Sequence, residues 1–256
     1  AFHPYDERVL ASAGVGKQVR LWNKDAGRVW QQRVLYSHDQ AVCSLAFSHD
    51  GCLLASSSHD KTIRVWNLRE DSSHRTLGGS QGHRDWIWTI AFSYDNQFLA
   101  SGSDDQTIKI WNIETERCVD TSVEHRHAVR GISFSPLDGK MMISGSYDQT
   151  VKIWNWSSDA QKLQCLKSWQ GLASQLRAVS FSPTNNLLAS CSGDRSVRVW
   201  SINFKEGTYE EKYKLEGHQD WVWCVAFSPN GKTLARASND GLVKVWKVDG
   251  DEIKSP

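Results

Sequence analysis

The chain has 256 residues, of which 39% are apolar and 23% are charged, so it carries enough apolar side chains for a folded core. Its 30 basic and 29 acidic side chains give a formal net charge of +1, which excludes a general electrostatic attraction to nucleic acid or anionic membranes. No uninterrupted apolar run approaches the roughly 20 residues of a membrane helix, and the start of the chain lacks the basic and apolar regions of a signal peptide.

One short phrase recurs six times along the chain: an apolar, a basic and an apolar residue followed by tryptophan. The six tryptophans are 43–46 residues apart, a spacing typical of an array of one repeated supersecondary unit. No break in the spacing divides the chain, so we expect one domain over residues 1–256. The phrases end at Trp22, Trp66, Trp111, Trp154, Trp200 and Trp246.

The residues between two tryptophans predict four short strands. In the third repeat, residues 86–92 and 98–103 are short apolar runs separated by turn-forming residues. Residues 107–111 alternate apolar and polar side chains, and a weaker strand is expected over 116–122. No segment has a helical period, so each repeat is predicted to be a four-stranded antiparallel meander.

The repeats also share a histidine, an aspartate about 20 residues later, and then the tryptophan. With these motifs the chain resembles the WD-repeat β-propeller family over essentially its whole length. The resemblance implies an all-β fold of six four-stranded blades. Because the first and last repeats lack complete end strands, two interpretations stay open: a segment of a larger propeller, which we favour, or a six-bladed ring that closes imperfectly. The motif is complete at His38, Asp60 and Trp66; His83, Asp105 and Trp111; His125, Asp148 and Trp154; and His218, Asp240 and Trp246.

The recurrence of histidine, serine and aspartate raises the question of hydrolase chemistry. A nucleophilic triad is a single constellation in one cleft, whereas this set recurs at a fixed spacing. The family resemblance implies instead a structural hydrogen-bond network, which in the third repeat would join His83, Ser101, Asp105 and Trp111.

Three repeats depart from the motif. The first has Gly16 at the aspartate position, and the fifth has Leu172 at the histidine position. The sixth has Arg236 at the serine position, so its network is expected to be incomplete.

Thirteen tryptophans exceed the six structural positions. Two copies of Asp-Trp-x-Trp, at 85–88 and 220–223, supply four of the others. The residue between the two tryptophans takes the packing position, so the tryptophans are predicted to point toward the channel mouth. In the family, these positions and the residue before the turn aspartate form the wide face on which partners dock. Carried over, that face presents Ala41, Cys43, His59, Trp86, Trp88, Asp104, Ala128, Arg130, Tyr147, Gln175, Arg177, Gly193, Trp221, Trp223 and Asn239.

Tryptophan, tyrosine and arginine are the residue types enriched at binding hot spots, and they gather on this predicted face. Two alternatives stay open: the tryptophans fill the channel lining or pack between blades, or tryptophan and arginine hold a flat ligand such as a nucleobase. The predicted partner-binding residues are Trp86, Trp88, Arg130, Tyr147, Arg177, Trp221 and Trp223.

The predicted function is a non-enzymatic platform that binds a protein or peptide, without a catalytic residue, metal or cofactor. No phosphate loop, metal-ligand cluster or acid–base pair lies outside the repeat pattern. The alternative is the sensor region of a larger STAND-type nucleotide-hydrolysing signalling protein, whose arrays the Gly-His-x-Asp-Trp-x-Trp phrases resemble. Six scattered cysteines without a CxxC pair predict free thiols and a location in the cytoplasm or nucleus.

Overall fold

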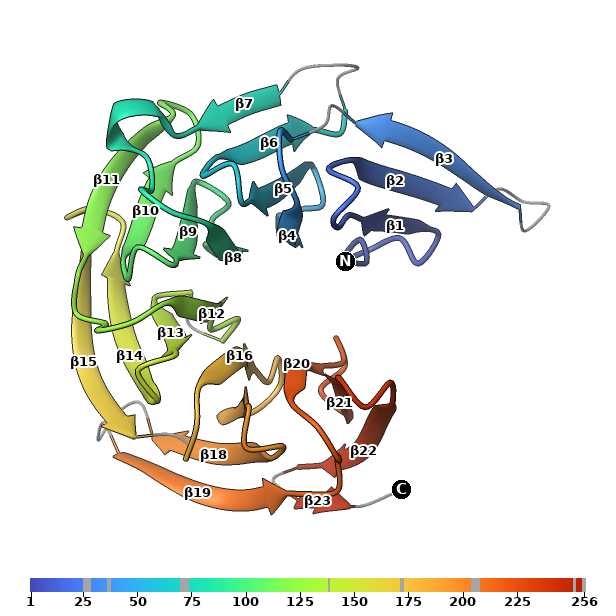
Figure 1. Cartoon of the computed structure of the whole chain (residues 1–256), viewed down its shortest axis with the longest axis vertical. Helices are drawn as coiled ribbons and strands as arrows, with labels where there is room; N and C mark the ends of the chain where they lie inside the picture. The colour runs from blue at the N-terminus through green and yellow to red at the C-terminus, as the bar shows by residue number, and fades with distance from the viewer. Residues whose placement is uncertain are drawn as a thin grey trace. The chain divides into compact units, whose positions relative to one another are not determined.

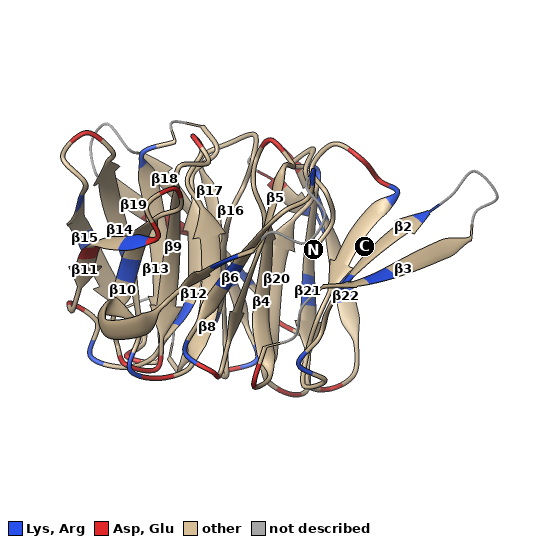
Figure 2. Ribbon diagram, turned by 90° about the horizontal axis from the view of Figure 1, so that it is seen from above, with Lys and Arg blue, Asp and Glu red and all other residues tan. Residues whose placement is uncertain are grey.

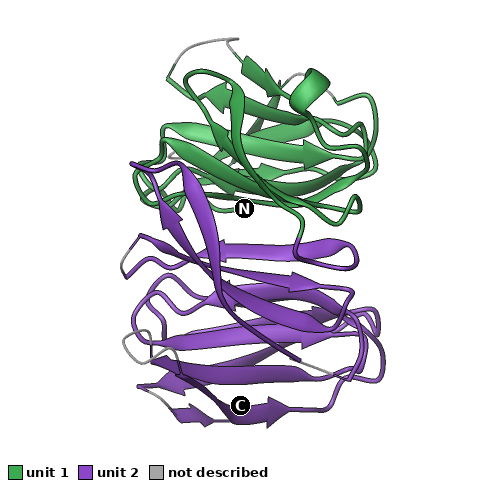
Figure 3. Cartoon of the chain, turned by 90° about the vertical axis from the view of Figure 1, so that its left-hand side faces the viewer, with its two compact units in different colours: residues 1–123 green, residues 124–256 purple. Residues whose placement is uncertain are grey.

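The chain folds into strands almost throughout the residues that its computed structural model describes. Those residues are 1–24, 29–35, 38–69, 74–137, 139–170, 173–203, 208–250 and 252–254, so Leu172 lies outside them. Within them the strands form six antiparallel sheets, here called blades 1–6 (Figure 1). Five blades have four strands, which confirms the predicted all-β propeller fold. The chain divides into two compact units, residues 1–123 and 124–256 (Figure 3).

Unit 1 contains blades 1–3. Blade 1 has three described strands, as expected from the incomplete first repeat, and a β-bridge between Phe2 and Leu10 lies where the other blades have an inner strand. A short 3-10 helix, η1 (Gly79–Gln81), precedes blade 3. The strands are β1 (Val9–Ser12), β2 (Val19–Lys24) and β3 (Trp30–Leu35) in blade 1; β4 (Val42–Phe47), β5 (Leu53–Ser58), β6 (Ile63–Asn67) and β7 (His74–Leu77) in blade 2; and β8 (Ile87–Phe92), β9 (Phe98–Ser103), β10 (Ile108–Asn112) and β11 (Arg117–Ser122) in blade 3.

Unit 2 contains blades 4–6, each with four strands in sequence order. Their inner strands approach closely, because a Cβ atom on Gly131 would lie 2.7 Å from the backbone nitrogen of Val179. The strands are β12 (Val129–Phe134), β13 (Met141–Ser146), β14 (Thr150–Ser157) and β15 (Lys162–Gln170) in blade 4; β16 (Leu176–Phe181), β17 (Leu187–Ser192), β18 (Val197–Asn203) and β19 (Thr208–Leu215) in blade 5; and β20 (Val222–Phe227), β21 (Thr233–Ser238), β22 (Val243–Asp249) and β23 (Glu252–Lys254) in blade 6.

The repeated phrase forms the third strand of blades 2–6 and the second of the three described strands of blade 1, in each case between two hydrogen-bonded neighbours. In β10, Ile108 and Ile110 are buried on one face, while Lys109 on the other face donates to Thr121. Trp111 closes the phrase and is fully buried. This alternation lets a blade pack against its neighbour, and one apolar cluster joins blades 2 and 3. That cluster includes Ala55, Ile63, Val65, Leu77, Ile87, Ile90, Phe92, Leu99, Trp111 and Ile113.

The implied hydrogen-bond network is present in blade 3. His83 Nδ1 lies 2.9 Å from Asp105 Oδ2, and His83 Nε2 lies 2.7 Å from Ser101 Oγ. Trp111 Nε1 donates to the same hydroxyl at 2.8 Å. Asp105 Oδ1 also accepts from the backbone and hydroxyl of Thr107, at 3.0 and 2.6 Å. The network therefore joins a loop, a turn and two strands, and it satisfies buried polar groups.

Blades 2 and 4 repeat the histidine contacts of this network. His38 lies 2.8 Å from Asp60 and 2.5 Å from Ser56, and the corresponding distances of His125 are 2.8 Å to Asp148 and 2.6 Å to Ser144. Because the same contacts recur in blades 2, 3 and 4, we interpret these histidine, aspartate and serine side chains as structural.

Arg236 replaces the serine in blade 6 and changes the network there. His218 keeps its contact with Asp240 at 2.7 Å, but His218 Nε2 has no hydrogen-bond partner in the described residues, so the expected incompleteness is confirmed. Arg236 is 1% exposed, and its guanidinium lies 4.1 Å from the Trp246 ring centroid. It donates to the carbonyl oxygens of Leu215 (2.6 Å) and Glu216 (2.5 Å). Burial lowers the pKa of Arg236 to about 10, which leaves it charged at neutral pH.

Stability is expected to fall on acidification in two stages. Burial lowers the pKa of His83 despite the opposing effect of Asp105, so the unfolded chain binds a proton first and the free energy of unfolding declines below about pH 6.5. Burial alone would raise the pKa of Asp60, Asp105 and Asp148, but hydrogen bonds from histidine and threonine outweigh it and lower the pKa. Their contribution is present above about pH 4 and is lost as the pH falls further.

Urea unfolding at pH 7.5, 5.5 and 3.5, followed by tryptophan fluorescence, measures both stages. The variant His83→Gln should show a smaller decline between pH 7.5 and 5.5 than the wild type. An unfolding free energy that stays constant from pH 7.5 to 3.5 would contradict this account.

Candidate partner-binding site

A β-bulge in the inner strand of blades 2–6 positions the residues that the sequence singled out. In each of these blades the pairing of the first two strands skips one residue of the inner strand. A bulge bends its strand and re-aims the side chain at the extra residue. The skipped residues are Cys43, Trp88, Arg130, Arg177 and Trp223, of which four are predicted site residues.

Arg177 is the centre of a cluster in unit 2. Its guanidinium carbon lies 4.0 Å from the ring centroid of Trp223, 4.6 Å from that of Trp221 and 5.3 Å from that of Tyr147. Its Nη1 atom donates to the Tyr147 hydroxyl at 2.7 Å. The side chain is buried, with 8% of its surface exposed. Aromatic faces attract a guanidinium electrostatically, so these contacts stabilise the positive charge of the buried Arg177 side chain.

Trp221 and Trp223 are the exposed part of this cluster, at 46% and 45%. Their rings meet edge to face, with centroids 6.2 Å apart. Asp220 fixes the segment, because its carboxylate accepts from the Trp221 backbone nitrogen and from the Asn239 side-chain amide, both at 2.7 Å. These bonds lower the pKa of Asp220, that of Asn239 being the larger influence. Both rings are thus presented to solvent in a fixed geometry.

Arg130 extends the cluster into blade 4. Its guanidinium carbon lies 4.2 Å from the Tyr147 ring centroid. Tyr147 therefore lies against two guanidinium groups, one from its own blade and one from blade 5. We call Arg130, Tyr147, Arg177, Trp221 and Trp223 the arginine–aromatic cluster.

Unit 1 contains a second group of rings, in blades 2 and 3. His59 stacks on Trp86 with centroids 4.0 Å apart and an interplanar angle of 12°. Trp88 meets both rings edge on, at 4.9 Å from His59 and 5.8 Å from Trp86. Trp86 is 40% exposed. We call His59, Trp86 and Trp88 the histidine–tryptophan stack.

The structure brings five of the seven predicted site residues together in unit 2 and the other two together in unit 1. Sequence reasoning placed His59 on the predicted face but missed its stacking on Trp86, and it missed the hydrogen bond from Arg177 to Tyr147. In both contacts the residue before a turn aspartate, His59 or Tyr147, touches the start of the next blade, at Trp86 or Arg177. The blade-to-blade order of the repeats could have suggested these pairs, because adjacent blades pack side by side.

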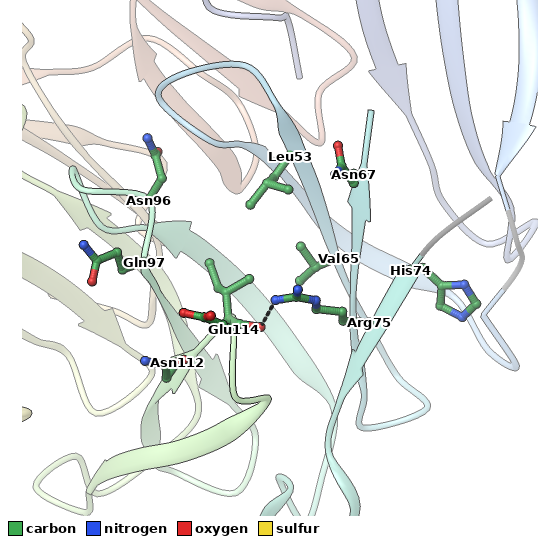
Figure 4. A pocket seen from close by; sticks show the side chains of 10 residues that line it. Leu53, Val65, Asn67, His74, Arg75, Asn96, Gln97, Asn112 and Glu114 are labelled. Carbon is green, nitrogen blue, oxygen red and sulfur yellow. Dashed lines mark hydrogen bonds between the residues drawn. The ribbon is translucent and has the colours of Figure 1, made fainter. Parts of the chain in front are cut away.

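A pocket of about 470 Å³ lies elsewhere in unit 1, between the outer parts of blades 2 and 3 (Figure 4). Arg75 of β7 reaches across it and donates to the carbonyl oxygen of Ile113 at 2.6 Å, as Figure 4 shows. Amide side chains make up much of its polar lining: Asn67, Asn96, Gln97 and Asn112. Arg75 thus links blades 2 and 3 across the pocket, and we interpret its role there as structural.

In the described part of the chain, neither a cluster of like charges nor a group of metal ligands indicates another site. Figure 2 shows basic and acidic residues interspersed over strands and loops rather than gathered by sign. No group of three or more His, Cys, Asp or Glu side chains within the described residues could hold a metal ion. Within those residues, no helix is long and apolar enough to cross a membrane. All six cysteines are free thiols.

Comparison with known families matches most of the chain to one repeat model. The model of the "WD domain, G-beta repeat" matches residues 30–67, 73–112, 116–155, 163–201 and 209–247. Each match begins near the outer strand of one blade and ends near the third strand of the next. Each sequence repeat therefore supplies the outer strand of one blade and the first three strands of the next.

Short segments also resemble curated proteins that contain such repeats. The chain is 41% identical over 70 residues to the coronin-like protein of Saccharomyces cerevisiae, which covers 27% of this chain and 10% of that protein. It is 37% identical over 93 residues to human coronin-7, covering 34% and 10%. It is 32% identical over 84 residues to WD repeat and SOCS box-containing protein 1 of Xenopus tropicalis, covering 32% and 19%. The matches thus span a tenth to a fifth of these relatives' length.

Proposed function

Because the chain belongs to the WD-repeat family of G-beta repeat proteins, we propose that it is a non-enzymatic platform that binds a protein or peptide partner. The observation that carries the proposal is the arginine–aromatic cluster, in which two half-exposed tryptophans surround the buried Arg177. Aromatic and arginine side chains with little conformational freedom are the usual anchors of protein interfaces. We assign the contact to this cluster and to Trp86 and Trp88 of unit 1.

The recurring histidine, serine and aspartate do not require a catalytic interpretation. His83 is 6% exposed and Ser101 is fully buried, so a substrate would not reach the serine hydroxyl. Both side chains are engaged in hydrogen bonds within their blade. The cysteines are free thiols, which fits a reducing compartment, and we propose the cytoplasm or nucleus.

Capture of partners on the immobilised chain tests the proposed surface. We expect simultaneous replacement of Trp86, Trp88, Arg130, Arg177, Trp221 and Trp223 by alanine to weaken partner binding by at least about tenfold, because these side chains supply the anchors. The measurement is the affinity of each captured protein, once purified, for wild type and variant.

The matched control replaces two exposed apolar residues on outer strands, Trp30→Ala and Leu166→Ala, which are 40% and 46% exposed. This control should bind as the wild type does, and circular dichroism should confirm that both variants are folded. Full-strength binding by the six-residue variant would refute the surface assignment.

The alternative of a sensor region in a larger STAND-type nucleotide-hydrolysing protein also has support. The phrase Asp-Trp-x-Trp occurs in blades 3 and 6, and each copy places a tryptophan pair edge to face. The sequence of the parent gene decides between the two: this alternative requires a phosphate-binding loop motif upstream of residue 1.

A further inference from the structure

His59 and Gly193 occupy equivalent positions in the two units. Each lies directly before the turn aspartate of its blade. Each also donates its backbone N–H to the residue just before the inner strand of its own blade, His59 to the Ala41 carbonyl at 3.0 Å and Gly193 to the Gln175 carbonyl at 3.1 Å. Each is followed by a blade that begins with Asp-Trp-x-Trp. The two sites differ in the side chain at this position and in the bulge residue of the same blade, which is Cys43 in unit 1 and Arg177 in unit 2.

In unit 1 that position is filled by a ring. The His59 imidazole stacks on Trp86 with nearly parallel planes, so the chain itself covers one face of this tryptophan. The stack shows which kind of group this geometry accepts: a flat ring between a turn and the first tryptophan of the next blade.

In unit 2 the same position has no side chain. A Cβ atom on Gly193 would lie 3.7 Å from Trp221 Cδ1 and 3.2 Å from Ser174 Oγ, so a side chain starting there would begin in contact with the edge of the tryptophan ring. Trp221 is 46% exposed. Among the described residues no ring stacks face to face on Trp221, over which the Arg177 guanidinium lies instead.

In the part of the chain that the structure describes, the Arg177 guanidinium beside this surface has no counter-ion, because the flanking carboxylates are engaged elsewhere, Asp194 by Ser196 and Asp220 by Trp221 and Asn239. The Arg177 guanidinium lies 4.6 Å from the Trp221 ring centroid. Among the described residues no carboxylate pairs with Arg177, and its buried Nε atom has no acceptor. A buried cation without an anionic partner favours a ligand that brings one.

We propose that Trp221 and Gly193 form an open stacking site for an aromatic side chain of an acidic peptide, whose carboxylate pairs with Arg177. The inference rests on the proposed function and specifies the partner chemistry of its unit 2 surface. The aromatic ring takes the place that His59 takes on Trp86, and the acidic neighbour supplies the missing charge.

Fluorescence anisotropy with labelled synthetic peptides tests this proposal. The probes are the pentapeptides Glu-Glu-Tyr-Glu-Glu, Glu-Glu-Leu-Glu-Glu and Gln-Gln-Tyr-Gln-Gln. We expect the wild-type chain to bind the first about threefold to tenfold more tightly than the second, the range that aromatic stacking adds to burial. We expect the third to bind more weakly than the first, with a smaller dependence on salt.

Two variants locate the site. Gly193→His supplies an internal ring like His59 and should abolish the preference for tyrosine over leucine, whereas Gly193→Ala should retain it. Trp221→Leu alters an exposed side chain and should abolish the same preference, so the test does not depend on one variant folding.

Equal binding of the tyrosine and leucine peptides, binding of neither, or an unchanged preference in Gly193→His and Trp221→Leu would each overturn the proposal. If partner capture is lost in the six-residue alanine variant while the peptides give one of these results, the proposed function stands and only the stacking site fails. If capture survives in that variant, the function itself fails.

Discussion

Asp105→Ala is expected to lower the free energy of unfolding by about 1–3 kcal/mol, the cost of leaving buried donors without an acceptor. The Asp105 carboxylate lies within hydrogen-bond distance of His83 Nδ1, and it accepts from the backbone N–H of Arg84 and from two groups of Thr107. Urea unfolding at pH 7.5 measures the loss, and Asp105→Asn, which keeps one acceptor oxygen, should lose less.

Asp95→Ala is the matched control in the same blade. Asp95 accepts two hydrogen bonds, from Ser93 and Gln97, but it lies in an exposed turn between β8 and β9. Water can replace the carboxylate there, so we expect a smaller loss than for Asp105→Ala. Equal losses for the two alanine variants would show that the buried network has no special role in stability.

Arg236→Ala is expected to lower the free energy of unfolding by about 2–4 kcal/mol. The change removes both donors to the carbonyl oxygens of Leu215 and Glu216, and it leaves a void beside Trp246. Thermal and urea unfolding of the variant provide the measurement.

Arg236→Ser distinguishes the two ways in which blade 6 can satisfy its buried groups. A serine there restores the hydroxyl that Ser101 provides in blade 3, so Trp246 and His218 Nε2 regain a partner. We therefore expect Arg236→Ser to be more stable than Arg236→Ala. If the serine variant is as unstable as the alanine variant, the network does not transfer between blades.

The fold was largely predictable because one pattern is repeated. The strand expected at 98–103 is β9 without change; the other three of that blade begin one residue later than expected, and β10 also ends one residue later. The local sequence determines such strands, because buried and exposed residues alternate before the repeated tryptophan. In blade 1 a bridge at Phe2 stands in place of an inner strand, as expected from the incomplete first repeat.

The site was less predictable, because its geometry depends on contacts between blades. A bulge shifts the two-residue period by one, so that Ile87 before it and Ile90 after it are both buried, but sequence reasoning did not use this shift and missed the positions of Trp88 and Arg177 in the bulge. Likewise, the sequence marked Arg236 as a defect, whereas its length lets it reach two carbonyl groups that a serine could not.

The central claim is that the arginine–aromatic cluster contacts the partner, and hydrogen–deuterium exchange with and without a captured partner tests it most directly. We predict slower amide exchange on binding at residues 128–130, 147, 175–177 and 220–223. Protection confined to the outer strands β15, β19 and β23, with those segments unchanged, would contradict the claim.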